Sequence, residues 1–233
     1  MAGGYVALGD SMSIDDYAGG PGRGAASLLH RNHDPDFPDW AGRDLSGSGL
    51  DARILAEDGA VAADVLKVQL PKIDGRPAVV TLSVGGNDLL RAYGDDAATE
   101  AAIHRVTVAV DAILRRLHGL NPDGRVVVTT VYDPSDGTGE IAPAGLPPWP
   151  QGPLLVRRLN AELTDAAGRH GASVADVHRR FLGHGVTAGD PSRSDPRPAE
   201  RDLWYCGVVE PNAWGAHEIR RAWWDALAFG TAS

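Results

Sequence analysis

The chain has 233 residues, with 31 acidic against 22 basic side chains, so its formal net charge is −9 at pH 7. That balance disfavours a nucleic-acid-binding protein, which would carry clustered basic residues, and it disfavours binding to anionic membranes. Hydrophobic residues make up 43% of the chain, enough for one sizeable core, and no linker divides it, so we expect one domain over residues 1–233.

The sequence shows few features of an exported or disulfide-bonded protein. Cys206 is the only cysteine, so no intramolecular disulfide can form. The first residues lack a basic segment followed by an apolar one, and no apolar run approaches the ~18 residues of a membrane span. We therefore expect a cytoplasmic protein without a membrane span, and the sequence leaves its oligomeric state unknown.

Apolar runs alternate with segments of helical periodicity, which is typical of βαβ units. The run at 78–84 is rich in β-branched residues, as expected of a strand buried on both faces. The expected strands span 5–8, 52–56, 78–84, 125–131 and 173–176. The expected helices span about 61–70, 96–120, 154–169 and 213–229, the last one capped by Asn212. This order predicts an α/β fold, a three-layer α/β/α sandwich with a parallel sheet of about five strands.

Two segments fit no regular structure. Residues 132–152 are rich in proline and glycine, and residues 183–201 are polar with three prolines. Both follow expected strands or lie near the expected functional edge of the sheet. Each is either a solvated loop or a cover over a substrate, and the sequence leaves both possibilities open.

Three glycine-containing motifs follow expected strands. Gly9-Asp10-Ser11 ends the first strand, Gly59 follows the second, and Gly86-Asn87-Asp88 follows the third. Ligands of open α/β sheets bind at the carboxyl edge of the strands, where these motifs should meet. The backbone N–H groups of Ser11 and Gly59 and the side-chain amide of Asn87 would together polarise a carbonyl oxygen there. The sequence therefore predicts a carbonyl-binding pocket that contains a serine hydroxyl.

The same motifs resemble the first three sequence blocks of the SGNH/GDSL hydrolases, in the family's order and over essentially the whole chain. The resemblance implies a flavodoxin-like sheet, Ser11 as the nucleophile, and an oxyanion hole built by Ser11, Gly59 and Asn87. Members of that family are mostly esterases, thioesterases, lipases or carbohydrate deacetylases. They need no metal, so the resemblance implies no cofactor.

The fourth block departs from the family pattern. The family usually has Asp-x-x-His followed by Pro-Asn, and Pro211 and Asn212 match the end of that pattern. Glu210 occupies the histidine position, and Gly207 occupies the aspartate position. The chain is therefore a divergent relative whose base has to be found elsewhere or has been replaced.

Three residues are candidates for the missing base. Glu210 is the first, although a free glutamate has a pKa about two units below that of histidine, a handicap of ~3 kcal/mol. Burial of the carboxylate can raise its pKa and recover much of that handicap. His217, in the last helix, is the second candidate, with Glu210 available to orient it. His184, in a glycine-flanked stretch, is the third, and either histidine is alternatively an ordinary helix or loop residue.

Further side chains are candidates for substrate contact. Asp10 is one, and it also suits an anchor of the first loop through hydrogen bonds to backbone. His184 is another. Trp204 and Trp214 flank the fourth block and would wall an apolar or sugar-binding pocket, unless they pack in the core or at its rim. No set of ligands with metal-binding spacing is present, so we expect no metal.

These observations favour a serine hydrolase acting on a small-molecule carboxylic ester or thioester, through Ser11, an oxyanion hole and a non-standard base. The missing histidine leaves two alternatives open. One is a non-hydrolytic cyclase, lyase or isomerase of small-molecule biosynthesis that uses Glu210 as acid and base on a related carbonyl substrate. The other is a binding protein that has lost catalysis.

Overall fold

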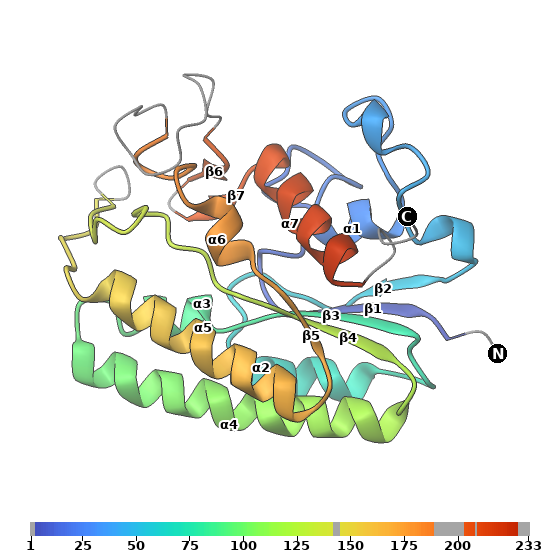
Figure 1. The fold of residues 1–233 in the computed structure, drawn as a ribbon, viewed down its shortest axis with the longest axis horizontal. Helices are drawn as coiled ribbons and strands as arrows, with labels where there is room; N and C mark the ends of the chain where they lie inside the picture. The colour runs from blue at the N-terminus through green and yellow to red at the C-terminus, as the bar shows by residue number, and fades with distance from the viewer. Residues whose placement is uncertain (1–2, 142–144, 189–202, 208, 228–233) are drawn as a thin grey trace.

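A five-stranded parallel sheet forms the centre of the molecule (Figure 1). The computed structural model describes residues 3–141, 145–188, 203–207 and 209–227. The strands lie in the order β2-β1-β3-β4-β5, with every adjacent pair parallel. They are β1 (Tyr5–Leu8), β2 (Ala52–Ile54), β3 (Val79–Ser83), β4 (Arg125–Thr129) and β5 (Ser173–Ala175). The predicted α/β sandwich with a parallel sheet of about five strands is confirmed, and its strand order is that of flavodoxin-like folds.

Helices cover both faces of this sheet, and each face has its own apolar core (Figure 1). On one face lie α2 (Ala62–Asp64), α4 (Asp96–Leu120) and α5 (Gly152–Arg169). On the other lie α1 (Ala25–His30), α6 (Val177–Phe181) and α7 (Ala213–Ala226). Because both faces are covered, β1 and β3 are buried along their whole length, which explains their nearly continuous apolar sequences.

The expected helix at 61–70 is more irregular than its sequence suggests. Only Ala62–Asp64 is α-helical, and a π-helical turn over Val65–Gln69 and a 3-10 turn over Leu70–Lys72 continue it. Pro71 lies in that last turn and lacks a backbone N–H, which favours an end to regular helix there. Single π turns are frequent beside functional sites.

The last helix begins as predicted. The Asn212 side chain accepts hydrogen bonds from the backbone N–H groups of Trp214 and Gly215, at 3.0 Å each. The expected continuation toward Phe229 lies outside the described residues. Just before the helix, β6 (Tyr205–Cys206) and β7 (Glu210–Pro211) form a small antiparallel pair that we did not predict, because two-residue strands leave no periodic pattern. The short helix α3 (Gly86–Leu90) was missed for the same reason.

Two aspartates organise the segment 132–152 where it leaves β4. Asp133 accepts hydrogen bonds from the Ser135 hydroxyl and from the backbone of Ser135 and Gly137. Asp136, at a φ of 51°, accepts from the backbone of Gly183, Gly185 and Thr187. The two loops that fit no regular structure are therefore joined where they are described; most of 183–201 lies outside the described residues. Across the described ranges, no helix is both long enough and apolar enough to cross a bilayer.

Candidate active site

The candidate site lies at the carboxyl ends of β1 and β3, where the strand order reverses direction. The connection from β1 leads to β2 on one side, and that from β3 leads to β4 on the other. Such a reversal opens a crevice between the two departing loops. Gly9 makes the turn after β1 with a φ of 132°, and a Cβ there would lie 2.0 Å from the carbonyl oxygen of Ser83. Only glycine fits this position, which explains the first residue of the Gly9-Asp10-Ser11 motif.

Asp10 fastens the loop that carries Ser11. Its buried Oδ1 accepts hydrogen bonds from the Ser83 hydroxyl at 2.9 Å and from the backbone N–H of Met12 at 3.2 Å. Burial raises the pKa of Asp10 to about 6, against the lowering effect of these hydrogen bonds, and the negative charge of Glu210 raises it further. Asp10 therefore holds the loop, as expected, and it also lies on the pocket wall.

Gln69 is a second anchor of this loop, and the sequence analysis missed it. Its buried side chain accepts a hydrogen bond from the Gly9 N–H and donates one to the Gly9 carbonyl oxygen, at 2.8 Å each. The π turn over Val65–Gln69 delivers the side chain to this point. A lone glutamine in an apolar segment was the available signal, since a buried amide has to satisfy its hydrogen bonds.

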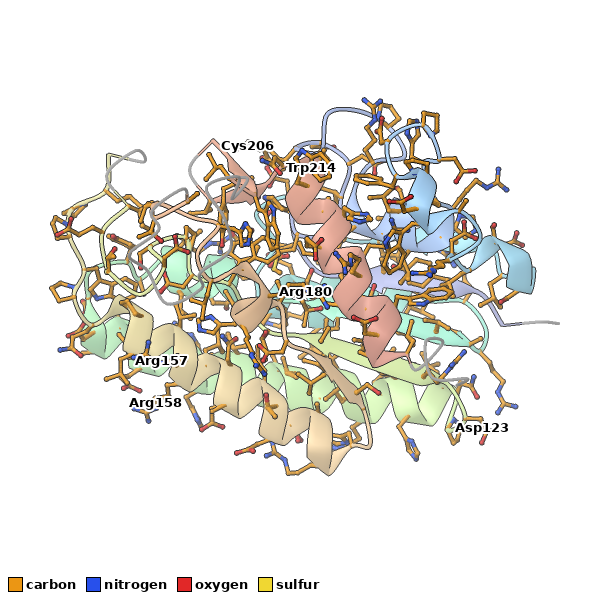
Figure 2. All side chains as sticks on the ribbon, turned by 45° about the horizontal axis from the view of Figure 1, so that its top comes forward. Asp123, Arg157, Arg158, Arg180, Cys206 and Trp214 are labelled. Atoms are coloured by element: carbon orange, nitrogen blue, oxygen red, sulfur yellow. The ribbon has the colours of Figure 1, made fainter. Side chains whose placement is uncertain are left out.

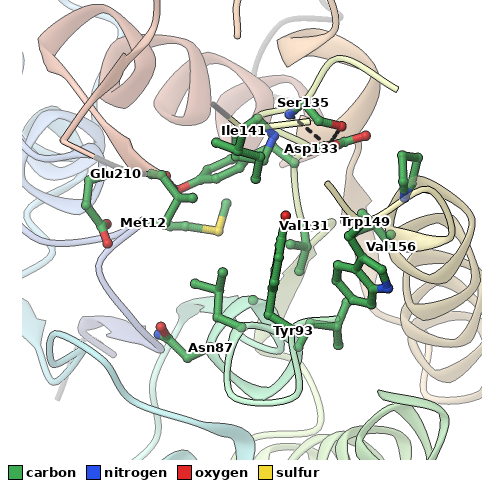
Figure 3. Close-up of a pocket in the computed structure, with 18 of the residues that line it drawn as sticks. Met12, Asn87, Tyr93, Val131, Asp133, Ser135, Ile141, Trp149, Val156 and Glu210 are labelled. Carbon is green, nitrogen blue, oxygen red and sulfur yellow. Dashed lines mark hydrogen bonds between the residues drawn. The ribbon is translucent and has the colours of Figure 1, made fainter. Parts of the chain in front are cut away.

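A cleft of about 730 Å³, a volume that includes space open to solvent, runs from the Ser11 loop toward α5 (Figure 3). Ser11, Asn87 and Glu210 contribute polar groups to the wall at one end, and Asp133 and Ser135 contribute polar groups nearer Trp149 (Figure 3). The rest is mostly apolar and comes from the Ser11 loop, α3, the end of β4, the segment 132–152 and α5. The apolar side chains are those of Met12, Leu89, Leu90, Tyr93, Val131, Tyr132, Pro134, Ile141, Trp149, Pro153, Val156 and Val209.

Ser11 and Glu210 face each other at the polar end. Ser11 is 6% exposed, and Glu210 reaches the cleft from β7, on the segment just before α7. Burial raises the pKa of Glu210, the Ser11 side chain opposes that rise as a hydrogen-bonding neighbour, and the charge of Asp58 adds to it. Glu210 Oε2 is buried and has no hydrogen-bond partner among the described residues, so the carboxyl group has an acceptor to spare.

Asn87 lies on the same wall at the start of α3. Its Nδ2 donates a hydrogen bond to the Ala60 carbonyl oxygen at 3.1 Å, which leaves its second N–H for another acceptor. Gly59, next to Ala60, has a φ of 68°, but it is not among the residues that line the cleft. The structure thus joins the segments of the second and third motifs, and it brings Gly86 and Asn87 of the third motif to the cleft wall.

His217 lies outside the residues that line the cleft, within a cluster between α7 and the segment that follows α1. Its ring stacks on Phe37 with centroids 4.0 Å apart, and its Nδ1 lies 2.7 Å from the Arg220 guanidinium. Because that guanidinium can only donate, Nδ1 accepts. Burial and the charges of Arg220, Arg221 and Arg180 lower the pKa of His217 to about 3. The structure therefore does not bring His217 to Ser11, contrary to the expectation that it offers a base.

The remaining candidates also lie away from the lining of the cleft. His184 lies within the segment that Asp136 fastens and stacks on Trp204 with ring centroids 3.4 Å apart, and both side chains are buried. Trp214 lies at the start of α7 (Figure 2). It is 52% exposed and contacts Phe37 edge-on. Of the two tryptophans, Trp204 is packed in the interior and Trp214 lies at the surface. Within the described ranges, no group of His, Cys, Asp or Glu side chains has an arrangement that could hold a metal ion.

Comparison with known proteins agrees with this architecture. A lipase from Streptomyces rimosus is 27% identical over 207 residues, which cover 80% of this chain and 74% of the lipase. The structure of phospholipase A1 from Streptomyces albidoflavus NA297 is similar with a TM-score of 0.63 at 23% identity, over 97% of this chain and 98% of that one. An acetylxylan esterase from Geobacillus stearothermophilus has a TM-score of 0.62 at 13% identity, over 98% and 95% of the two chains.

At these identities the two structures support the fold alone. The sequence-family match extends further, because the family model of the GDSL-like lipase/acylhydrolase family matches residues 7–217, nearly the whole chain. The resemblance noted in the sequence is thereby confirmed. The family match indicates an esterase-like hydrolase that acts on a small-molecule ester. The chain belongs to the GDSL-like lipase/acylhydrolase family.

Proposed function

We propose that this protein hydrolyses carboxylic esters or thioesters through a covalent intermediate on Ser11, with Glu210 as the base. One observation carries the proposal. The Ser11 side chain and a half-buried carboxyl group of raised pKa face each other at one end of a mostly apolar cleft. A nucleophile and a base within reach of each other are the minimum that acyl transfer requires.

The reaction divides into two steps. In the first, Ser11 Oγ forms a bond to the carbonyl carbon while Glu210 takes the hydroxyl proton. The bond from that carbon to the ester oxygen or thioester sulfur then breaks, and Glu210 returns the proton to the leaving alcohol or thiol. In the second, water loses a proton to Glu210 and attacks the acyl carbonyl carbon. The bond from that carbon to Ser11 Oγ then breaks, Glu210 returns the proton to Oγ, and the carboxylic acid leaves.

Glutamate suits this cleft because of its surroundings. A base works best when its pKa lies near the working pH. Burial and the charge of Asp58 both raise the pKa of Glu210 toward that range. Asp10 and Tyr132 face the same negative charge, which contributes to their own raised pKa values. Because Oε2 has no hydrogen-bond partner within the described protein, the carboxylate can take up a proton without first losing a hydrogen bond at that oxygen.

The developing negative charge on the carbonyl oxygen needs donors. We assign this role to the Ser11 backbone N–H and to the N–H of Asn87 that does not bond Ala60. Removal of one such donor typically lowers kcat by about 10²–10³-fold. Gly59 supports the site indirectly, because the adjacent Ala60 carbonyl fixes the Asn87 side chain.

Substitution of the nucleophile tests the proposal directly. We expect Ser11→Ala to lower kcat on p-nitrophenyl butyrate by at least about 10⁴-fold, since the covalent route is lost. A fluorophosphonate probe should label the wild-type protein stoichiometrically and leave the variant unlabelled, with unchanged circular dichroism as the control for folding. Full turnover by Ser11→Ala, together with its loss in Glu210→Gln, would overturn the proposal and support proton transfer by Glu210 alone, as in a lyase or isomerase.

A further inference from the structure

We propose that Trp149 is the specificity-determining end wall of an acyl-binding channel, and that the substrates are esters of aliphatic acids whose length this wall limits. The inference rests on the proposed function, because it takes Ser11 and Glu210 as the reacting end of the cleft. It assigns a role to the described residues of the segment 132–152, which are 132–141 and 145–152, for which the sequence left cover and solvated loop both open. The assignment depends on the orientation of the ester, the fixation of Trp149 and the chemistry of the walls.

The proton route sets the orientation of the ester. Glu210 has to return a proton to the leaving oxygen, so the alcohol side of the ester lies toward Glu210. The acyl side then points away from it, along the cleft. Figure 3 shows Glu210 at one end and the Tyr93 and Trp149 rings at the other, with Met12 between them. The acyl group therefore enters the apolar part of the cleft and ends against these rings.

Trp149 is a fixed wall, held by contacts at its ring and at its backbone. Its indole Nε1 donates a hydrogen bond to Asp96 Oδ1 at 2.8 Å, at the first residue of α4. Its backbone N–H donates to the Gly139 carbonyl oxygen at 2.7 Å. The indole ring lies 4.8 Å from the Tyr93 ring, centroid to centroid, and Trp149 is only 7% exposed. Polar bonds at the rim thus hold an apolar ring face at the end of the cleft.

The neighbouring residues leave room only for this arrangement. A Cβ at Gly139 would lie 2.5 Å from the Trp149 carbonyl oxygen, and one at Gly152 would lie 2.8 Å from the indole ring. The Tyr93 hydroxyl donates a hydrogen bond to the Pro147 carbonyl oxygen at 2.8 Å, which ties the segment to the turn after α3. The end wall is consequently set by several independent contacts on either side of Trp149.

The side walls indicate the kind of acyl group. Leu90, Ile141 and Val156 belong to the cleft lining and offer hydrocarbon surface, whereas Asp133 and Ser135, which also line the cleft, are hydrogen-bonded to each other. Among the lining residues that the structure describes, none is Lys, Arg or His, so no cation is available there for a carboxylate or phosphate on the acyl chain. Each methylene group that a neutral aliphatic chain buries in the cleft makes its binding free energy more favourable, until the chain reaches Trp149.

Acyl chain length provides the test. We would measure kcat/KM on the p-nitrophenyl esters of acetate, butyrate, octanoate, laurate and palmitate. For the wild type we expect kcat/KM to rise with length, by about four- to tenfold for each methylene group that the channel accommodates, and then to fall. In Trp149→Ala the maximum should move to a longer ester, because the end wall is removed. The same measurement on a matching series of alkyl acetates, in which only the alcohol becomes longer, shows whether the acyl group or the alcohol occupies the channel.

A variant that fills the channel covers the case in which Trp149→Ala does not fold. Val156→Phe adds volume from α5 and should move the maximum toward acetate. Trp214→Ala is the matched control, because it removes an exposed tryptophan outside the cleft lining and should leave the profile unchanged. Two results would overturn this inference: an unchanged length profile in folded Trp149→Ala and Val156→Phe, or a length dependence found only in the alkyl acetates. In either case the proposed function would stand as long as turnover depends on Ser11. Turnover that survives in Ser11→Ala would overturn the proposed function instead.

Discussion

Glu210 and His217 stand seven positions apart and occupy opposite kinds of environment. Glu210 lies in β7 and faces an open cleft, whereas His217 lies on α7 within a cluster of aromatic rings and arginines. Burial shifts the pKa of both groups toward the neutral form, up for Glu210 and down for His217. The same cause makes the carboxylate a stronger base and the imidazole a weaker one. A base is therefore identified by its access to the nucleophile and by the direction of its pKa shift, more than by its residue type.

Substitution of these two residues should have its largest effect on turnover. We expect Glu210→Gln to lower kcat by about 10²–10⁴-fold, because the amide keeps the shape of the side chain and cannot take the Ser11 proton. The matched change His217→Gln should leave the kcat of the folded protein unchanged, since the ring lies outside the cleft lining. Both values come from steady-state kinetics on p-nitrophenyl butyrate, with circular dichroism as the control for folding.

The reverse result would reassign the base. If His217→Gln alone lost turnover while its spectrum stayed native, the His217 cluster would have to open during catalysis. The static contacts with Phe37 and Arg220 would then describe a resting state.

The pH dependence of turnover should separate the two groups next. Glu210 acts in its ionised form, so kcat/KM should rise with pH through the pKa of Glu210, which lies above the ordinary value of 4.5. The negative charge of Asp58 is one cause of this raised pKa. The Asp58 side chain accepts a hydrogen bond from the Tyr17 hydroxyl. In Asp58→Asn the rising limb should consequently move to lower pH, as measured by initial rates across a buffer series. A limb that stays in place in Asp58→Asn and disappears in His217→Gln would contradict the assignment to Glu210.

The sheet could be predicted from the sequence because buried parallel strands produce continuous apolar runs. The run at 78–84 became β3, and the turn residues that follow each run placed the motifs at one edge. The irregular turn over 65–69 could not be predicted, because its form depends on the contact that Gln69 makes with Gly9, sixty positions earlier in the chain.

The candidate site was predictable in part for a similar reason. Ser11 and Asn87 follow strands directly, so the sheet fixes where they lie. Trp149 reaches the cleft through hydrogen bonds to Asp96 and Gly139, and nothing local in the sequence 132–152 signals those partners. His217 and Trp204 looked available because helix and loop positions do not reveal which face is covered. Their stacking on Phe37 and His184 is a tertiary contact. The roles of Ser11, Asn87 and Glu210 stay predictions.

The smallest effect concerns stability, and it tests the burial of His217. A folded-state pKa of about 3 lies below the ordinary value of 6.5, so between those values the unfolded chain binds more protons than the folded one. The contribution of His217 to stability is complete above about pH 6.5 and is lost as the pH falls toward 3. Between about pH 7 and pH 5 this loss amounts to about 2 kcal/mol in the free energy of unfolding.

His217→Gln removes the titration along with the ring. At about pH 7 the variant should be less stable than the wild type by about 1–2 kcal/mol, because it loses the stacking on Phe37. The gap should shrink as the pH falls, since only the wild type has to bury a group that would otherwise take up a proton. Urea unfolding at about pH 7 and pH 5 measures both differences. A gap that stays constant would mean that His217 meets solvent in the folded protein, and the contrast with Glu210 would then rest on position alone.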